Sequence, residues 1–136
     1  MNAAIVDTDV ASMLFKSDTR AQRYRAHLTG RLLGVSFMTL AELERWQLGR
    51  NWGAARRADL ARHLTSYAVL PATRELCLKW AEVSWEARRK GRPIQTADAW
   101  IAASALYYQV PLVTNNANDY QAVSQLQLLT CADYSP

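Results

Sequence analysis

The sequence predicts an α/β fold with a mainly parallel central sheet. Short apolar runs alternate with longer helical patterns, which is typical of chains that build parallel sheets. The 136 residues fit one compact unit, and half of them are hydrophobic, which is enough for a real core. Because no repeat, low-complexity run or linker interrupts the pattern, we expect a single domain over residues 1–136.

The first half of the chain predicts two strands and four helical stretches. The opening apolar run ends at an acid, Asp7, and a later helical stretch is stopped by Gly30. Thr39 is expected to open the following helix, which ends near Gly49. The expected strands are 3–6 and 32–36, and the expected helices are 10–16, 18–28, 39–49 and 53–66.

The second half predicts three strands, two helices and one helical turn. Pro71 closes a short strand, and Gly91 followed by Pro93 stops the longest helix. Thr96 is expected to cap the next helix. The expected strands are 68–70, 111–114 and 126–129, the helices are 73–90 and 96–108, and the turn is 118–123.

The net charge is +4, from sixteen basic residues, mostly arginines, against twelve acidic residues. Arginine matches the geometry of phosphate oxygens better than lysine does. Charge alone is weak evidence for nucleic-acid binding, since a solvated basic surface has the same composition.

The chain has no apolar run of the ~20 residues that a membrane span needs. Its opening segment lacks a basic region and reaches Asp7 too early for a signal peptide. We therefore expect a cytoplasmic protein without a membrane partner. In that compartment Cys77 and Cys131 are expected to be reduced thiols.

Four acidic regions are candidates for chemistry, because ligands of such sheets gather at the carboxyl ends of the strands. Asp7 follows the first strand, and the polar segment 114–119 follows a late one. Glu42 and Asp98 fall in the first turns of helices. Each also has a structural explanation: Asp7 can cap a helix, Glu42 can form a capping box with Thr39, and Asp98 can interact with the helix dipole.

Taken together, these acids favour a hard cation. Oxygen ligands suit Mg²⁺ or Mn²⁺, which keep several waters when bound. Zinc is disfavoured, because His27 and His63 have no ligand spacing with each other or with a cysteine. Both histidines are expected to be surface or packing residues.

Four motifs in order resemble those of PIN domains, and the resemblance spans nearly the whole chain. The motifs are Ile5-Val6-Asp7-Thr8-Asp9, Thr39-Leu40-Ala41-Glu42-Leu43, Asp98-Ala99-Trp100-Ile101-Ala102-Ala103, and Leu112-Val113-Thr114-Asn115-Asn116 continued by Asp119-Tyr120. The subgroup that the chain resembles is the VapC-type toxin ribonucleases of toxin–antitoxin pairs.

The resemblance implies a doubly wound PIN-like fold and Mg²⁺- or Mn²⁺-dependent cleavage of RNA by a metal-activated water. Asp7 and Asp98 take the metal-binding roles. Asn116 departs from the common pattern, because many members have an aspartate there, and Asp119 is the candidate replacement. The implied catalytic residues are Asp7, Glu42, Asp98 and Asp119, and the supporting residues are Thr8, Thr114 and Asn116.

The implied partners are an RNA substrate, a cognate antitoxin protein and a second copy of the chain in a homodimer. Candidate RNA-binding residues are Arg45, Arg50, Arg56 and Arg57, with a second group at Arg88, Arg89, Lys90 and Arg92. Trp46 and Trp52 could stack on bases, although packing explains them equally well. The remaining tryptophans, Trp80, Trp85 and Trp100, are expected to pack in the protein.

Two other functions stay open. A non-catalytic RNA- or protein-binding module of the same fold is favoured by Asn116. A phosphatase resembling the haloacid dehalogenases is suggested by Asp7-Thr8-Asp9-Val10, but the three lysines are all expected on helices and Asp98 has no adjacent acid.

Overall fold

The computed structural model describes residues 2–131 and has a five-stranded sheet with the order β3-β2-β1-β4-β5. All four strand pairings are parallel. The strands are β1 (Ala3–Val6), β2 (Leu32–Ser36), β3 (Ala68–Leu70), β4 (Leu112–Val113) and β5 (Leu128–Leu129). The helices are α1 (Thr8–Lys16), α2 (Ala21–Leu28), α3 (Phe37–Gly49), α4 (Ala54–Leu64), α5 (Arg74–Arg89) and α6 (Thr96–Tyr108), with a 3₁₀ turn η1 (Ala117–Tyr120). The predicted α/β class with a parallel sheet is confirmed.

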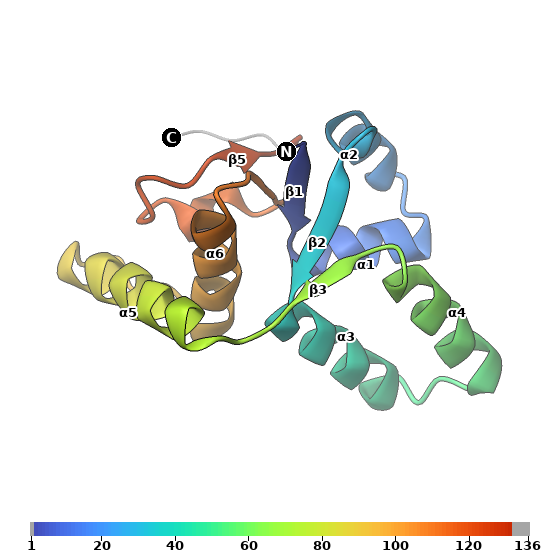
Figure 1. The fold of residues 1–136 in the computed structure, drawn as a ribbon. Helices are drawn as coiled ribbons and strands as arrows, with labels where there is room; N and C mark the ends of the chain where they lie inside the picture. The colour runs from blue at the N-terminus through green and yellow to red at the C-terminus, as the bar shows by residue number, and fades with distance from the viewer. Residues whose placement is uncertain (1, 132–136) are drawn as a thin grey trace.

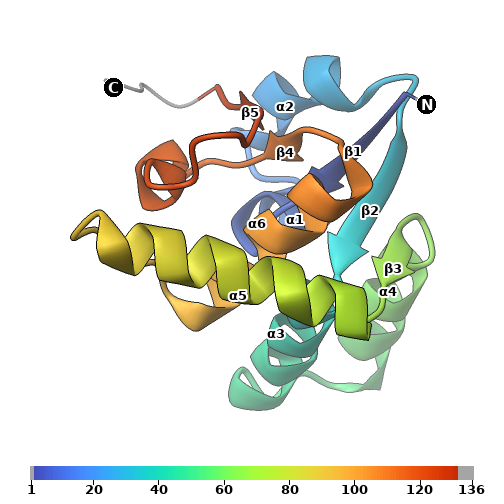
Figure 2. The same cartoon turned by 60° about the vertical axis from the view of Figure 1, so that its left-hand side comes forward.

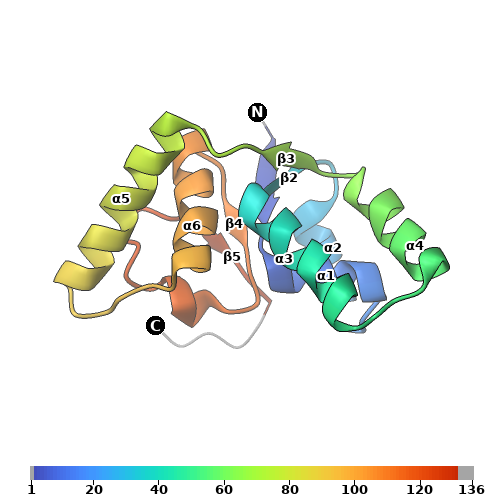
Figure 3. The same ribbon diagram turned by 90° about the horizontal axis from the view of Figure 1, so that it is seen from below.

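Helices cover both faces of the sheet. Helix α6 lies against one face with α5 on its outer side, and α1, α2 and α4 lie on the other side (Figures 1 and 3). Figure 2 shows α5 crossing α6. Side chains of β1 alternate between the two cores, as a strand requires: Ala4 and Val6 pack into one cluster, and Ile5 packs into the other. The central strands β1 and β4 are therefore buried, whereas the edge strand β3 is largely exposed.

An aromatic cluster joins the α3–α4 hairpin to α1. The Trp46 and Trp52 rings lie 4.7 Å apart, and Phe15 of α1 lies 5.7 Å from Trp52. The guanidinium of Arg56 lies 4.5 Å from the centre of the Phe15 ring, and His63 packs on Phe15 from α4. Both tryptophans are partly buried against the core, so packing accounts for them.

The starts of α1, α2 and α3 differ from the prediction by two or three residues, and α2 begins at Ala21 and not at Asp18. Helix α1 begins at Thr8, directly after its cap, and not at Val10. Helix α3 begins at Phe37, where the Ser36 hydroxyl accepts a hydrogen bond from the Met38 amide at 3.0 Å. The prediction that Thr39 opens this helix is therefore wrong, because a hydroxyl three residues earlier already caps it.

At α6 the capping position is Gln95, without a side-chain cap, so the expectation for Thr96 is also wrong. The expected role of Gly91 is confirmed: its φ of +74° is a left-handed conformation that glycine adopts without steric cost just past the end of α5.

The tryptophans of α5 and α6 have different environments. Trp80 and Trp100 stack with their ring centres 5.3 Å apart, as expected for packing residues. Trp85 is 63% exposed, so the expectation that it packs in the protein is wrong. Its helical neighbours explain this, because Val83 and Ala87 provide the buried face of α5 and Trp85 lies on the other side.

No helix within residues 2–131 is long and apolar enough to cross a membrane. Cys77 and Cys131 are both free thiols, as expected.

Candidate metal-binding active site

Asp7 lies where β1 ends and α1 begins, and it is 3% exposed. Its Oδ1 accepts the amide hydrogen of Val10 at 2.9 Å and so caps α1. Its Oδ2 accepts the Thr114 hydroxyl from the end of β4 at 2.5 Å. Burial raises the pKa of Asp7 to about 7; the two hydrogen bonds oppose the rise, and the charges of Asp9 and Asp98 add to it.

Glu42 is connected to α1 by a chain of hydroxyls. The Thr8 hydroxyl donates to Glu42 Oε1 at 2.7 Å and shares a 2.9 Å hydrogen bond with the Thr39 hydroxyl. Since the single Thr8 hydrogen is used toward Glu42, Thr39 donates to Thr8. Thr39 is fully buried. Glu42 thus points to α1, and not back to the backbone of its own helix as the capping-box hypothesis required.

Asp98 lies in the first turn of α6. Burial raises its pKa to about 6, with further increases from the charges of Asp119, Glu42 and Asp9. The buried hydroxyl of Tyr120, at the end of η1, donates to Asp98 Oδ1 at 3.4 Å and opposes the rise. The effect of Asp119 on Asp98 shows that these two carboxylates are near each other.

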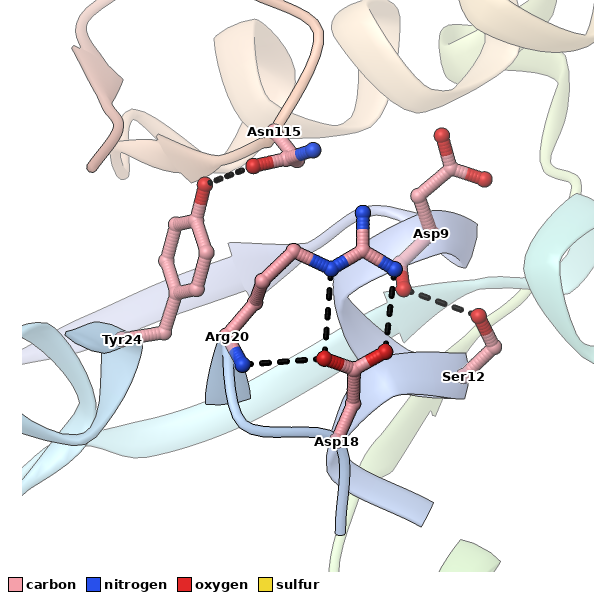
Figure 4. Close-up of polar contacts among 6 residues, drawn as sticks. All are labelled: Asp9, Ser12, Asp18, Arg20, Tyr24 and Asn115. Carbon is pink, nitrogen blue, oxygen red and sulfur yellow. Dashed lines mark hydrogen bonds and ion pairs between the residues drawn. The ribbon is translucent and has the colours of Figure 1, made fainter. Parts of the chain in front are cut away.

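Thr114 and Asn116 form the β4 side of the site. The Thr114 hydroxyl accepts the Asn116 amide hydrogen at 2.9 Å while it donates to Asp7. The Asn116 side-chain amide donates to Asp9 Oδ2. Next to them, the buried Tyr24 donates to Asn115 Oδ1 at 2.6 Å (Figure 4), so α2 supports this loop.

One cavity of about 210 Å³ collects these groups. It is lined by Asp7, Thr8, Asp9, Glu42, Gln95, Asp98, Ile101, Asn116, Asp119 and Tyr120. Five of the ten residues are carboxylates, and none is basic. All four predicted catalytic acids and the supporting Thr8 and Asn116 line the cavity, and Thr114 contacts it through Asp7.

Sequence reasoning missed four residues of this site. Thr39 was assigned to a helix cap, and Tyr120 was noted only as part of a motif. Ile101 lines the cavity but was noted only as part of a motif, and Gln95 lines it without any signal in the sequence. The feature of the sequence that could have indicated Tyr120 is its position directly after Asp119.

The donor set of the cavity fits a hard divalent cation. Repulsion among the carboxylates contributes to the raised pKa values of Asp7 and Asp98, and no basic side chain lining the cavity offsets it. Within residues 2–131, however, no three acidic, histidine or cysteine side chains are close enough together to hold a metal directly. The arrangement therefore suits an ion such as Mg²⁺, which keeps several of its waters and needs only one or two direct carboxylate ligands.

The arginines predicted to bind RNA lie outside the cavity, on α3, α4 and the segment between them. Arg45 and Arg50 are exposed. Arg57 donates from Nε to the Trp52 carbonyl at 2.9 Å, and Arg56 covers the Phe15 and Trp52 rings, so these two also have structural contacts.

The second basic group lies near the C-terminal end of α5. Arg89 pairs with Glu86, and Lys90 donates to the Ala122 carbonyl at 3.0 Å. Arg92 donates to Gln121 and lines a second cavity, of about 300 Å³, that it shares with Asp98 and Asp119. Arg92 is thus the member of this group that is nearest to the acidic site.

Comparison with known proteins agrees with this architecture. The PIN domain family model matches residues 4–125. The chain is 31% identical over 127 residues to Ribonuclease VapC1 of Haemophilus influenzae (strain R2866), which covers 90% of this chain and 93% of that protein. This protein belongs to the PIN domain family.

Two solved structures resemble the fold. A chain of VapBC-1 from nontypeable Haemophilus influenzae is 26% identical, with a TM-score of 0.73 and coverage of 94% of this chain and 97% of that one. A chain of VapBC-5 from Mycobacterium tuberculosis, a member of the VapBC family of toxin–antitoxin systems, is 24% identical, with a TM-score of 0.70 and coverage of 98% and 100%.

Proposed function

We propose that this protein is a divalent-metal-dependent endoribonuclease and the toxin of a toxin–antitoxin pair. The observation that carries the proposal is the cavity lined by five carboxylates and by no basic residue, in a PIN chain that is similar to a ribonuclease over nearly its whole length. Mg²⁺ or Mn²⁺ is the expected ion, because all the candidate ligands are oxygens.

The residues of the cavity have distinct roles in this proposal. Asp7 and Asp98 hold the ion, and Asp7 is fixed for this by two hydrogen bonds. Bound Mg²⁺ or Mn²⁺ lowers the pKa of a water and offsets the charge of the scissile phosphate. Glu42, oriented by Thr8, holds the attacking water in line with phosphorus and accepts its proton. Asp119, which lines the cavity together with Asp98, would add a further carboxylate for holding the ion.

The partners follow from relatives of this chain. The VapBC structures contain such chains together with an antitoxin, so we expect a cognate antitoxin here as well. We also expect a homodimer, which light scattering of the purified protein would detect as twice the mass of 15.3 kDa. The expected location is the cytoplasm, where RNA is available.

The alternative functions differ in their fit. A non-catalytic binding module would need neither Glu42 nor the ion, whereas the hydroxyl chain from Thr39 to Glu42 orients an otherwise unused carboxylate. The phosphatase hypothesis is wrong, because the chain belongs to the PIN domain family. Moreover, none of the three lysines lines the acidic cavity.

The test is RNA cleavage by the wild type and by Asp98→Asn, each with Mn²⁺ and with EDTA. We expect cleavage by the wild type with Mn²⁺ only, and at least a ~100-fold loss in the variant, because the amide keeps the shape but removes the charge that holds the ion. Asp59→Asn, an equal charge change at a half-buried position of α4 outside the cavity, where Asp59 pairs with Arg62, is the matched control. Wild-type rates from Asp98→Asn would refute the proposed site, and cleavage in EDTA would refute the metal dependence.

A further inference from the structure

Asp9 is a carboxylate of the cavity that the proposed mechanism leaves without a role. It lies in the first turn of α1 and is exposed, so its side chain does not pack in the hydrophobic core. Its charge contributes to the raised pKa of both Asp7 and Asp98. Asp9 lines the same cavity as Asp7 and Asp98, the two proposed metal ligands.

The carboxylate of Asp9 is held by a residue that is distant in the sequence. Its Oδ2 accepts the side-chain amide of Asn116, which follows β4. The backbone amide of Asn116 is in turn fixed on the Thr114 hydroxyl, the same hydroxyl that donates to Asp7. One chain of hydrogen bonds thus runs from Asp9 through Asn116 and Thr114 to Asp7.

Arg20 does not pair with Asp9. Figure 4 shows the Arg20 guanidinium turned to Asp18, and the Asp9 carboxylate pointing away from it. Arg20 donates to Asp18 from Nε at 3.2 Å and from Nη2 at 2.9 Å. The charge of Asp9 contributes to the raised pKa of Arg20, but among the residues that the structure describes no hydrogen bond or ion pair joins the two. The Asp9 carboxylate lines the acidic cavity and is held there by Asn116.

We propose that Asp9 and Asn116 act as one unit that supplies the cavity with one negative charge and one amide donor, and that this unit helps to bind the divalent ion. Asp9 acts on the ion directly or through a retained water, and Asn116 is the positioning residue that aims it. The inference rests on the proposed function, since it concerns the ion of that site. It also gives Asn116 a role that an aspartate in its place could not have, because an aspartate would repel Asp9 and could not donate to it.

The test exchanges the two side chains. Mn²⁺ binding is measured by calorimetry at pH 7.5 without RNA, for Asp9→Asn, Asn116→Asp, the double variant with both changes, and Asp59→Asn as the matched charge control. We expect Asp9→Asn to weaken Mn²⁺ binding about tenfold, as losses around a metal site do. The double variant keeps the pair with its roles reversed, so we expect it to bind within about threefold of the wild type.

The measured Mn²⁺ affinities distinguish failure of this inference from failure of the proposed function. Asp9→Asn with wild-type affinity, or a double variant as weak as Asp9→Asn, would overturn the inference and leave the proposed function intact. Absence of Mn²⁺ binding by the wild type would overturn both. Absence of RNA cleavage by a wild type that binds Mn²⁺ would refute only the ribonuclease. Circular dichroism of each variant excludes loss of folding as the cause of a change.

Discussion

At the scale of single residues, burial in the folded protein disfavours the ionised form of the Asp7 carboxylate. Its pKa, raised to about 7 by burial, lies well above the ordinary value of 3.8. The raised pKa means that the folded state favours protonated Asp7. The stability that this preference contributes is fully present below about pH 4 and is lost as the pH rises through 7. In the absence of an ion, ionised Asp7 destabilises the folded state.

We therefore expect Asp7→Asn to raise the free energy of unfolding in EDTA at pH 8, by roughly 2–4 kcal/mol. The amide oxygen can still cap α1 through Val10, and the amide nitrogen can donate to the Thr114 hydroxyl, whose own hydrogen then loses its acceptor and offsets part of the gain. Urea unfolding at pH 8 and pH 4 measures the effect, which should nearly vanish at pH 4. Mn²⁺ should stabilise the wild type and not the variant. A variant less stable than the wild type at pH 8 would contradict the account.

Asp119 and Asn116 differ in what they bring to the cavity. Asp119 has a charge close to Asp98, whereas Asn116 acts through a hydrogen bond. We expect Asp119→Asn to slow Mn²⁺-dependent cleavage about tenfold or more, and Asn116→Ala to have the smaller effect. Single-turnover cleavage of one RNA by both variants makes the comparison. The reverse order would mean that Asn116 is the more important residue at this side of the site.

At the scale of elements, the strands were predictable and the helix starts were less so. Strands β1 and β2 are apolar runs with sharp ends, so their limits are local properties of the sequence. The start of α3 is not, because Ser36 and Thr39 both carry a hydroxyl that can cap a helix. Tertiary structure decides between them: Thr39 is buried and bonded to Thr8 of another helix. Glu42 lines the cavity with the other acids, but its hydrogen-bond partner is Thr8 and not the backbone of Thr39.

The site shows the same division. The four acids were predictable from motifs, since each follows a strand or begins a helix. The pairing of Asp9 with Asn116 joins residues 107 positions apart and leaves no local pattern. The exposure of Trp85 was missed for the same reason, because composition does not tell which face of α5 meets α6.

The α3–α4 hairpin depends on its aromatic cluster, which gives a test at this scale. Trp52 contacts Trp46, Phe15 and Arg56. We expect Trp52→Ala to lower the free energy of unfolding by about 2–4 kcal/mol, since a large, partly buried side chain is removed. Trp85→Ala is the control, with a change within about 0.5 kcal/mol for an exposed residue. Equal effects of the two changes in urea unfolding would contradict the assigned packing.

At the scale of the whole molecule, the charges are divided between an acidic cavity and a basic surface. The net charge of +4 lies mostly on exposed arginines, while the cavity has five acids. RNA would therefore be held outside the cavity by its phosphates and would enter it only where the ion offsets the repulsion.

Arg45 and Arg50 are the candidates to test for this contact, because both are exposed. Alanine at either position should weaken RNA binding and lower the slope of log affinity against log salt by about one. Fluorescence anisotropy with a labelled RNA, at several salt concentrations, measures both. Arg31→Ala, which alters an arginine at the opposite edge of the sheet just before β2, is the control. Unchanged slopes would show that the phosphates contact other residues.

The strand order has a consequence for when the protein becomes active during its synthesis. Strand β1 is made first, yet its neighbour β4 and the Thr114 that holds Asp7 come 107 positions later. Asp98 and Asp119 also belong to the last third of the chain. A chain that ends before Tyr120, whether it is still being translated or is cut short by a stop codon, lacks lining residues of the cavity. The cell therefore meets the nuclease only when translation is nearly finished, and an antitoxin needs to recognise only the finished product.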